Sequence, residues 1–139
     1  MLDFSRVFAG PAAAQVLGDL GADVIKIEAP GTGDEARMLG LTEGEAPRLG
    51  ASASYLALNR NKRSITLDLK AEAGRAVARR LMLGADVAIH NFRPGSMRGW
   101  GLDYDDIRPG NPRLIFGEFF AYGPEGPLSD FGANDLALQ

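Results

Sequence analysis

The most regular pattern in the chain is a strict alternation of apolar and polar residues over residues 65–70, which places the apolar side chains on one face of a strand. Directly after it, apolar residues recur at every fourth position, at Ala73, Val77 and Leu81. Gly84 follows at the place where a helix commonly ends. The pattern therefore predicts a strand over residues 65–70 and a helix after it.

The first 28 residues show a strand, a helix and a second strand. Residues 1–7 give only a short strand, and residues 12–20 fit a helix with Pro11 in its first turn. The mostly apolar residues 23–28 are typical of a parallel strand covered on both faces. The order strand, helix, strand indicates a βαβ unit. The apolar stripe expected on the helix consists of Ala13, Val16, Leu17 and Leu20.

The remaining segments continue this alternation of strands and helices. Residues 29–51 are rich in glycine and proline and predict a long irregular segment, whereas residues 52–58 fit a helix or a strand equally well. Further strands are expected at residues 85–89 and 114–120, and short helical segments at residues 34–38, 96–100, 104–108 and 134–139. The whole pattern predicts an α/β domain with a largely parallel sheet and right-handed crossovers.

Composition narrows the classes of protein to which the chain can belong. Its 139 residues and 45% hydrophobic content suit one soluble domain. The chain has no cysteine and one histidine, which excludes disulfides, thiol nucleophiles and the usual zinc sites. No apolar run approaches the roughly 20 residues that cross a bilayer, so we expect no membrane partner and take the cytoplasm as the default location.

Basic residues are concentrated in one part of an acidic chain. The net charge of −3 argues against binding to nucleic acids in general, which requires a broad positive surface. Seven of the fifteen Lys and Arg residues nevertheless fall within residues 60–80. This local excess of positive charge indicates a small anionic partner.

Four turns are the candidates for ligand binding. Parallel sheets bind ligands at the carboxyl ends of their strands, where loops and helix N-termini meet. The turns at residues 9–11, 31–37, 67–70 and 91–95 all follow predicted strands, so we expect them to share one edge of the sheet. Neither the glycine-rich dinucleotide fingerprint nor the phosphate loop of ATP-binding proteins is present, and NAD or ATP therefore has little support.

Several side chains at these turns admit both a functional and an ordinary interpretation. Arg37, Lys70 and Arg93 are candidates for a charge-assisted clamp on a phosphate or carboxylate, although each alone fits a solvated surface charge. His90 is expected to be a buried histidine rather than a general base, because no nucleophile accompanies it. Gln15 either offers its amide to a ligand or lies on the helix surface. Taken residue by residue, the sequence predicts an anion-binding α/β segment of undefined activity.

Taken together and in order, the motifs resemble those of one family. They are Phe8–Pro11 with Gln15, Leu20–Glu28, Gly33–Asp34 with Arg37, Asn59–Lys70, Ala85–Val87, Asn91–Gly95 and Asn111–Ile115. This series resembles the family III CoA transferases, which include formyl-CoA:oxalate CoA-transferase, carnitine CoA-transferase and α-methylacyl-CoA racemase. The resemblance covers essentially the whole chain.

The resemblance carries expectations about architecture and partners. It implies a Rossmann-like large domain, of which residues 1–139 would be the N-terminal part, truncated at both ends and without the family's small domain. It further implies an interlocked homodimer. The anionic partner would be coenzyme A in the form of an acyl-CoA, with a carboxylic acid as the second substrate and no metal.

The resemblance also implies a set of CoA-binding residues. Gln15 and Val16 are similar to the first pair that contacts CoA, and Arg37 to the arginine after the Gly-Asp turn. The segment along the nucleotide and the turn beneath it correspond to Leu67, Asp68, Leu69, Lys70, Asn91, Phe92 and Arg93. One basic residue of the family falls at Gly99 here, and its contact is not carried over.

The family's chemistry depends on an aspartate nucleophile that attacks an acyl-CoA and forms a mixed anhydride. By the resemblance this aspartate is expected beyond Gln139, so the chain alone is expected to be inactive. Asp135 corresponds to a different family aspartate. Asn134 stands where the racemase branch has a histidine, and asparagine exchanges no proton near neutral pH. This favours CoA transfer over the first alternative, an acyl-CoA epimerase similar to the racemase. The second alternative, an inert CoA-binding fragment, depends instead on whether residues beyond Gln139 carry the aspartate.

Overall fold

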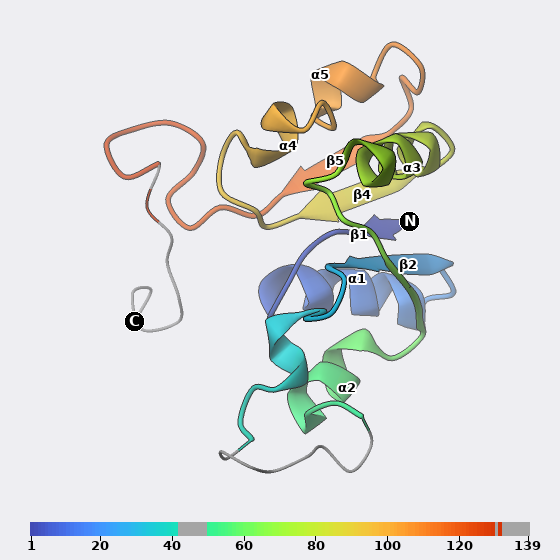
Figure 1. Cartoon of the computed structure of the whole chain (residues 1–139), viewed down its shortest axis with the longest axis vertical. Coiled ribbons are helices and arrows are strands. Elements are labelled where there is room, and N and C mark those ends of the chain that lie inside the picture. Colours follow the sequence, from blue (N-terminus) through green and yellow to red (C-terminus); the bar gives the residue numbers. More distant parts are fainter. Residues whose placement is uncertain (42–49, 130, 132–139) are drawn as a thin grey trace.

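The computed structural model describes residues 1–41, 50–129 and 131. In this part of the chain five strands form one parallel sheet with the order β3-β2-β1-β4-β5 (Figure 1). The strands are β1 (Leu2–Asp3), β2 (Val24–Glu28), β3 (Lys62–Thr66), β4 (Val87–His90) and β5 (Ile115–Glu118). The predicted α/β class and the parallel sheet are confirmed.

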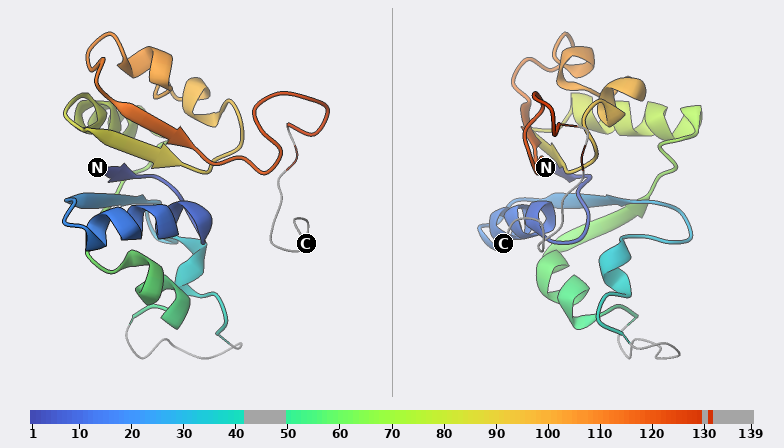
Figure 2. Two further views of the ribbon diagram at one scale, coloured as in Figure 1. Left: turned by 180° about the vertical axis from the view of Figure 1, so that it is seen from behind. Right: turned by 90° about the vertical axis from the view of Figure 1, so that its left-hand side faces the viewer.

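Helices connect the strands and cover both faces of the sheet. They are α1 (Ala9–Asp19), α2 (Ala53–Asn59), α3 (Glu72–Leu83), α4 (Ser96–Gly99) and α5 (Tyr104–Ile107), with a 3₁₀ turn η1 (Glu35–Arg37). Figure 2 shows α1 and α3 on either side of the sheet. The ambiguous residues 52–58 are helical, and the short helices expected near residues 34–38, 96–100 and 104–108 are confirmed. The expected helix at residues 134–139 lies outside the described residues.

The core is divided between the two faces of the sheet. Successive strand residues point to opposite faces, so Ala88 packs in the larger cluster with Ala78 and Met82 of α3, whereas Ile89 packs with Ala14 of α1. Met97 of α4, Ile107 of α5 and Leu102 between these helices are also buried in the larger cluster. None of the helices in the described ranges is long and apolar enough to cross a membrane.

The apolar stripe predicted on α1 is wrong. Val16 is 54% exposed and Leu20 is 80% exposed, while the buried residues are Gly10, Pro11, Ala14, Gln15 and Gly18. Small residues four apart let this helix approach its neighbours closely, because a Cβ added to Gly10 would overlap the Ser5 side chain. The helix is held by close backbone approach rather than by its large apolar side chains.

The stripe predicted on α3 is displaced by one position. Ala78 and Met82 are fully buried, whereas Val77 and Leu81 are only partly buried. One turn before Ala78, a Cβ added to Gly74 would overlap the Asp68 carbonyl. The missing side chain at Gly74 therefore allows residues 67–70 to lie against the start of α3.

The predicted strand over residues 65–70 is also displaced. Strand β3 begins at Lys62 and ends at Thr66, because β2 ends at Glu28 and offers no further partner beyond the bond from the Leu67 N–H to the Glu28 carbonyl. Residues 67–70 continue as a loop with a turn at Asp68, whose side chain accepts the Lys70 N–H at 2.9 Å. This exit from the sheet delivers the segment to the carboxyl edge.

Candidate functional site

A cavity of about 350 Å³ lies at the carboxyl edge of the sheet. Its lining comes from the segments that follow four of the five strands. The lining residues are Phe4, Arg6, Ile27, Glu28, Ala29, Gly33, Asp34, Leu67, Asp68, Leu69, Lys70, Phe92, Arg93, Ser96 and Trp100. The expectation that four turns share one edge is confirmed for the turns at residues 31–37, 67–70 and 91–95, whereas residues 9–11 do not line this cavity.

The walls of this cavity, called the edge cavity below, combine aromatic rings with charges. The rings of Phe92 and Trp100 meet edge to face at a centroid distance of 5.2 Å. Arg6, Lys70 and Arg93 bring positive charge from the ends of β1, β3 and β4. Such a mixture of apolar surface and a few convergent charges is typical of a site for a small ligand with an anionic part.

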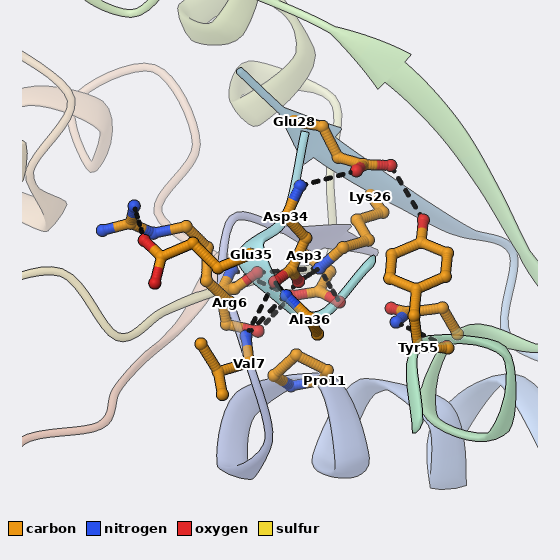
Figure 3. Close-up of polar contacts among 12 residues, drawn as sticks. Asp3, Arg6, Val7, Pro11, Lys26, Glu28, Asp34, Glu35, Ala36 and Tyr55 are labelled. Atoms are coloured by element: carbon orange, nitrogen blue, oxygen red, sulfur yellow. Dashed lines mark hydrogen bonds and ion pairs between the residues drawn. The ribbon is translucent and has the colours of Figure 1, made fainter. Parts of the chain in front are cut away.

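Asp34, a carboxylate of the cavity lining, is neutralised from behind by Lys26. The two side chains are at most 1% exposed, and Lys26 Nζ lies 2.9 Å from Asp34 Oδ2 (Figure 3). Asp34 also accepts the N–H groups of Val7 at 3.1 Å and Ala36 at 2.9 Å. Asp34 therefore fastens the turn after β2 to the turn after β1 and adds no unpaired negative charge to the cavity.

Glu28, the second such carboxylate, accepts five hydrogen bonds. Arg37 donates from Nε and Nη2, both at 2.7 Å, the Tyr55 hydroxyl at 2.9 Å, Ser64 at 2.6 Å and the Asp34 N–H at 2.9 Å. Burial alone would raise the pKa of Glu28, but these bonds, with Arg37 foremost, lower it to about 2. Glu28 is therefore ionised and fully partnered.

Arg37 lies behind this carboxylate rather than in the edge cavity. Its guanidinium also donates to the Tyr55 hydroxyl at 2.7 Å and lies over the Tyr55 ring at 4.0 Å. The hydrogen bond with Glu28 raises the pKa of Arg37. The structure thus separates Arg37 from Lys70 and Arg93, with which a joint clamp is predicted.

Most of the basic residues between positions 60 and 80 are engaged by the protein itself. Lys62 is 1% exposed at its side chain and lies 2.9 Å from Asp3 Oδ2, and burial lowers the pKa of its ammonium group. Arg60 and Arg63 form ion pairs with Asp19 and Asp23. Of the seven residues that suggest an anionic partner, Lys70 alone lines the edge cavity.

The turn after β4 is held by two side chains. Asn91 Oδ1 accepts the Arg6 N–H at 2.8 Å, and Asn91 Nδ2 donates to the Arg6 carbonyl at 2.7 Å. The His90 ring nitrogen Nδ1 accepts the Phe92 N–H at 3.2 Å. Phe92 and Arg93 are thereby fixed in the wall of the edge cavity.

His90 is a buried histidine, as predicted. Because Nδ1 accepts a hydrogen bond, the ring proton lies on Nε2, which is 3.1 Å from Glu118 Oε1. Burial lowers the pKa of His90, and the nearby Glu118 and Asp103 carboxylates oppose this effect. The ring stacks on Phe92 at 5.8 Å and meets Phe116 edge to face at 5.4 Å. His90 supports the turn and does not face the edge cavity.

A second cavity of about 410 Å³ adjoins the first and shares Phe92 and Arg93 with it. Its other lining residues are Ala9, Asn91, Pro94, Glu118, Phe119, Phe120, Ala121, Ser129 and Phe131. Glu118, whose side chain is 40% exposed, brings a carboxylate to this space. The turn after β4 therefore forms a wall common to both cavities.

Of the ten predicted CoA-binding residues, six line the edge cavity: Leu67, Asp68, Leu69, Lys70, Phe92 and Arg93. Gln15 and Val16 do not: Gln15 is buried and donates to Asp19 at 2.6 Å, and Val16 points to solvent. Asn91 lines the second cavity. Asn134 and Asp135 lie outside the described residues.

Arg6 is the basic residue of the cavity that sequence reasoning missed. It lies three residues beyond the end of β1 and three residues before the predicted turn at residues 9–11. The signal that could have found it is its position at the carboxyl end of the central strand. Arg98, which stands beside the position of a basic residue in the family, pairs with Asp103 at 2.9 Å and does not line the cavity.

Comparisons with known proteins agree with this architecture. The family model described as CoA-transferase family III matches residues 1–139. The succinate–glutarate CoA-transferase of Agrobacterium fabrum is 44% identical over 100% of this chain and 35% of its own length. The succinyl-CoA:glutarate CoA-transferase of Homo sapiens is 40% identical over 100% of this chain and 31% of its own length.

Solved structures show the same fold. The crystal structure of a CAIB/BAIF family protein from Brucella suis matches 97% of this chain and 35% of that protein, with a TM-score of 0.87 and 42% identity. The chain thus spans about a third of the length of the relatives that it matches. With a family model that matches its full length and a fold shared with a solved relative, the chain belongs to CoA-transferase family III.

Proposed function

We propose that this chain forms the CoA-binding part of a CoA transferase, and that the edge cavity is its CoA site. The observation that supports this most directly is the meeting of Lys70 and Arg93 in one cavity with Phe92 and Trp100. Among the described residues, neither Lys70 nor Arg93 makes an ion pair. Their charges therefore remain for a ligand.

The residues of the cavity fit the chemistry of CoA. CoA presents phosphate groups, an adenine ring and an extended pantetheine arm. Lys70 offers a point charge and Arg93 a forked guanidinium, which are the two side chains that bind phosphate best. The apolar faces of Leu67, Phe92 and Trp100 suit the uncharged parts of the molecule.

The buried ion pairs behind the cavity are proposed to keep the site preformed. Glu28 and Asp34 anchor the turn after β2 through their bonds to Arg37 and Lys26. A turn that is already ordered loses little conformational freedom when a ligand binds, so more of the interaction energy appears as affinity. The partnered carboxylates also spare an incoming phosphate from repulsion.

The reaction proposed for the whole protein is the transfer of CoA between an acyl-CoA and a carboxylic acid. An aspartate carboxylate attacks the thioester carbonyl, the CoA thiolate leaves, and a mixed anhydride of the aspartate forms. We place this aspartate beyond Gln139, so that residues 1–139 hold and orient CoA but do not catalyse transfer alone. The names of the relatives point to dicarboxylic acids such as glutarate as acceptors. An interlocked homodimer and a cytoplasmic location remain predictions.

Calorimetric titration with CoA tests the proposal. The variant Lys70→Ala/Arg93→Ala is expected to bind CoA at least about tenfold more weakly, because two charge-assisted contacts are lost. Its control, Arg80→Ala/Arg113→Ala, removes two exposed charges near the opposite edge of the sheet and is expected to bind as the wild type does. A folded wild-type protein that does not bind CoA would overturn the proposal.

A further inference from the structure

We propose that Arg6 is the third phosphate-binding cation of the edge cavity, and that Asn91 positions it. Arg6 is not among the ten residues predicted to contact CoA. The inference rests on the proposed function, because it takes CoA as the ligand. It changes the roles of two predicted residues, Arg37 and Asn91.

The position of Arg6 follows from the topology of the sheet. Strand β1 is the middle strand of the five, and Arg6 follows its carboxyl end. Lys70 and Arg93 arrive from β3 and β4, so three cations from three strands line the same cavity. An anion bound there can therefore meet three cations rather than one, although the Asp68 carboxylate also lines the cavity.

The backbone of Arg6 is fixed on both sides. Asn91 engages the N–H and the carbonyl of Arg6 at 2.8 and 2.7 Å. The next residue, Val7, has a φ of 68°, which is an uncommon conformation for a β-branched residue. Asp34 accepts the Val7 N–H and holds this turn in place (Figure 3). Strain that the surroundings retain in this way is a mark of functional sites.

The guanidinium of Arg6 makes only weak contacts in the protein, which a ligand can replace. It lies 5.2 Å from the centre of the Phe92 ring and 3.3 Å from Glu35 Oε1. The side chains of Arg6 and Glu35 are 46% and 74% exposed, so their ion pair contributes little and a phosphate can displace it. Until a ligand binds, the contact with the Phe92 ring keeps the Arg6 side chain at the wall of the edge cavity.

Arg37 is poorly suited to this role. Its fork already binds both oxygens of Glu28, whose side chain is 2% exposed. Withdrawing Arg37 toward a phosphate would leave a buried carboxylate short of its main partner, which is strongly unfavourable. Arg6 therefore takes the place in the clamp that the sequence predicts for Arg37.

Asn91 acts through Arg6 rather than on the ligand. Its amide oxygen and nitrogen are both engaged by the Arg6 backbone, and its side chain lines the second cavity, not the first. We therefore assign Asn91 as a positioning residue. A change at Asn91 is expected to reduce CoA binding only while Arg6 is present to be misplaced.

The first test titrates Arg6→Ala and Arg6→Lys with CoA and with pantetheine, which lacks the phosphates. Arg6→Ala is expected to bind CoA about tenfold more weakly and pantetheine as the wild type does, with partial recovery in Arg6→Lys. The matched control is Arg63→Ala, which removes an exposed arginine paired with an exposed acid at the other edge. Glu35→Gln, which frees Arg6, is expected to bind CoA as well as the wild type or slightly better.

The outcomes separate this inference from the proposed function. If Arg6→Ala binds CoA as the wild type does while Lys70→Ala/Arg93→Ala does not, the role of Arg6 is overturned and the CoA site stands. An equal loss of CoA and pantetheine in a folded Arg6→Ala protein also overturns it, because the phosphates would not be involved. If folded wild-type protein binds no CoA, both proposals fall.

A double-mutant cycle tests the role of Asn91. Asn91→Ala is expected to weaken CoA binding in the wild type and to add little loss in the Arg6→Ala background. The same loss in both backgrounds would show that Asn91 contacts the ligand itself. Thermal unfolding of each variant, measured alongside, identifies any variant whose loss comes from a disturbed fold.

Discussion

Two sets of charged residues lie at the same edge of the sheet and differ in what surrounds them. In the inner set Lys26, Glu28 and Asp34 are buried and engaged by other protein groups. In the outer set Arg6, Lys70 and Arg93 line the edge cavity. Among these three, Arg6 makes an ion pair, and its partner Glu35 is exposed. Residue type does not separate the sets, because each contains a lysine. Partners and burial separate them.

The difference indicates that the two sets have different functions, one in stability and the other in binding. Removing one member of a buried pair leaves an uncompensated charge in a poorly solvated place, so the inner set should govern stability. Removing an exposed charge changes the free energy of folding little but removes a contact for an anion, so the outer set should govern binding. The following variants test that separation.

The largest effect is expected for Lys26→Met. It would leave Asp34 without its ion-pair partner and take a donor from the Ser5 carbonyl, 2.8 Å from Nζ. We expect a loss of about 3–5 kcal/mol in the free energy of unfolding, measured with urea. Glu35→Gln, at an exposed acid one residue from Asp34, should change it by less than about 0.5 kcal/mol. A Lys26→Met protein as stable as the wild type would contradict the structural role of the inner set.

Glu28→Gln is expected to have the next largest effect, with a distinct pH dependence. The pKa of Glu28 is lowered from 4.5 to about 2, so the unfolded state binds its proton first as the pH falls. The stabilisation, about 3 kcal/mol, is complete above pH 4.5 and is lost as the pH falls toward 2. Urea unfolding at several pH values should show a shallower decline in this range for Glu28→Gln. Parallel curves for the two proteins would be the contrary result.

His90 should give a smaller effect in a different pH range. Burial lowers the pKa of His90 below its ordinary value of 6.5, with Glu118 and Asp103 opposing. The unfolded state therefore binds the proton first, and the contribution of His90 to stability falls as the pH falls below about 6.5. His90→Asn should cost about 1–2 kcal/mol at pH 7 and remove this slope, measured by urea unfolding between pH 7 and pH 5. An unchanged slope in the variant would show that His90 is not its source.

The smallest effect on stability is expected at the outer set. Lys70→Ala should change the free energy of unfolding by less than about 0.5 kcal/mol, because Lys70 is exposed and the Lys70 N–H, not its ammonium group, makes the bond to Asp68. Its affinity for CoA should nevertheless fall about tenfold in a calorimetric titration. A large loss of stability here would remove the distinction between the two sets.

The sequence predicted the order of elements and the parallel sheet because both depend on local periodicity and on turn residues. It also placed most of the cavity-lining segments, since residues 67–70 and 92–93 follow strands and therefore reach the carboxyl edge. The faces of α1 and α3 were predicted wrongly, because close approach at Gly10 and Gly74 outweighed the burial of larger apolar side chains.

The sequence did not show which charged side chains pair within the protein and which face the cavity. Lys62 and Lys70 look alike in the sequence, but Lys62 meets Asp3 from a strand 59 positions away and Lys70 meets the cavity. Arg37 is expected from the sequence to face the ligand and instead pairs with Glu28 for the same reason, because Glu28 and Tyr55 reach Arg37 only in the folded chain. Pairings between distant segments decide which cations are left for a ligand.

The most direct test of the separation between the two sets is thermal unfolding of three proteins with and without saturating CoA. We expect that the wild type is stabilised by CoA and that Glu28→Gln unfolds at a lower temperature but is still stabilised by CoA. Lys70→Ala/Arg93→Ala should unfold at the wild-type temperature and show little response to CoA. If CoA stabilises Lys70→Ala/Arg93→Ala as much as it stabilises the wild type, the outer set does not form the CoA site.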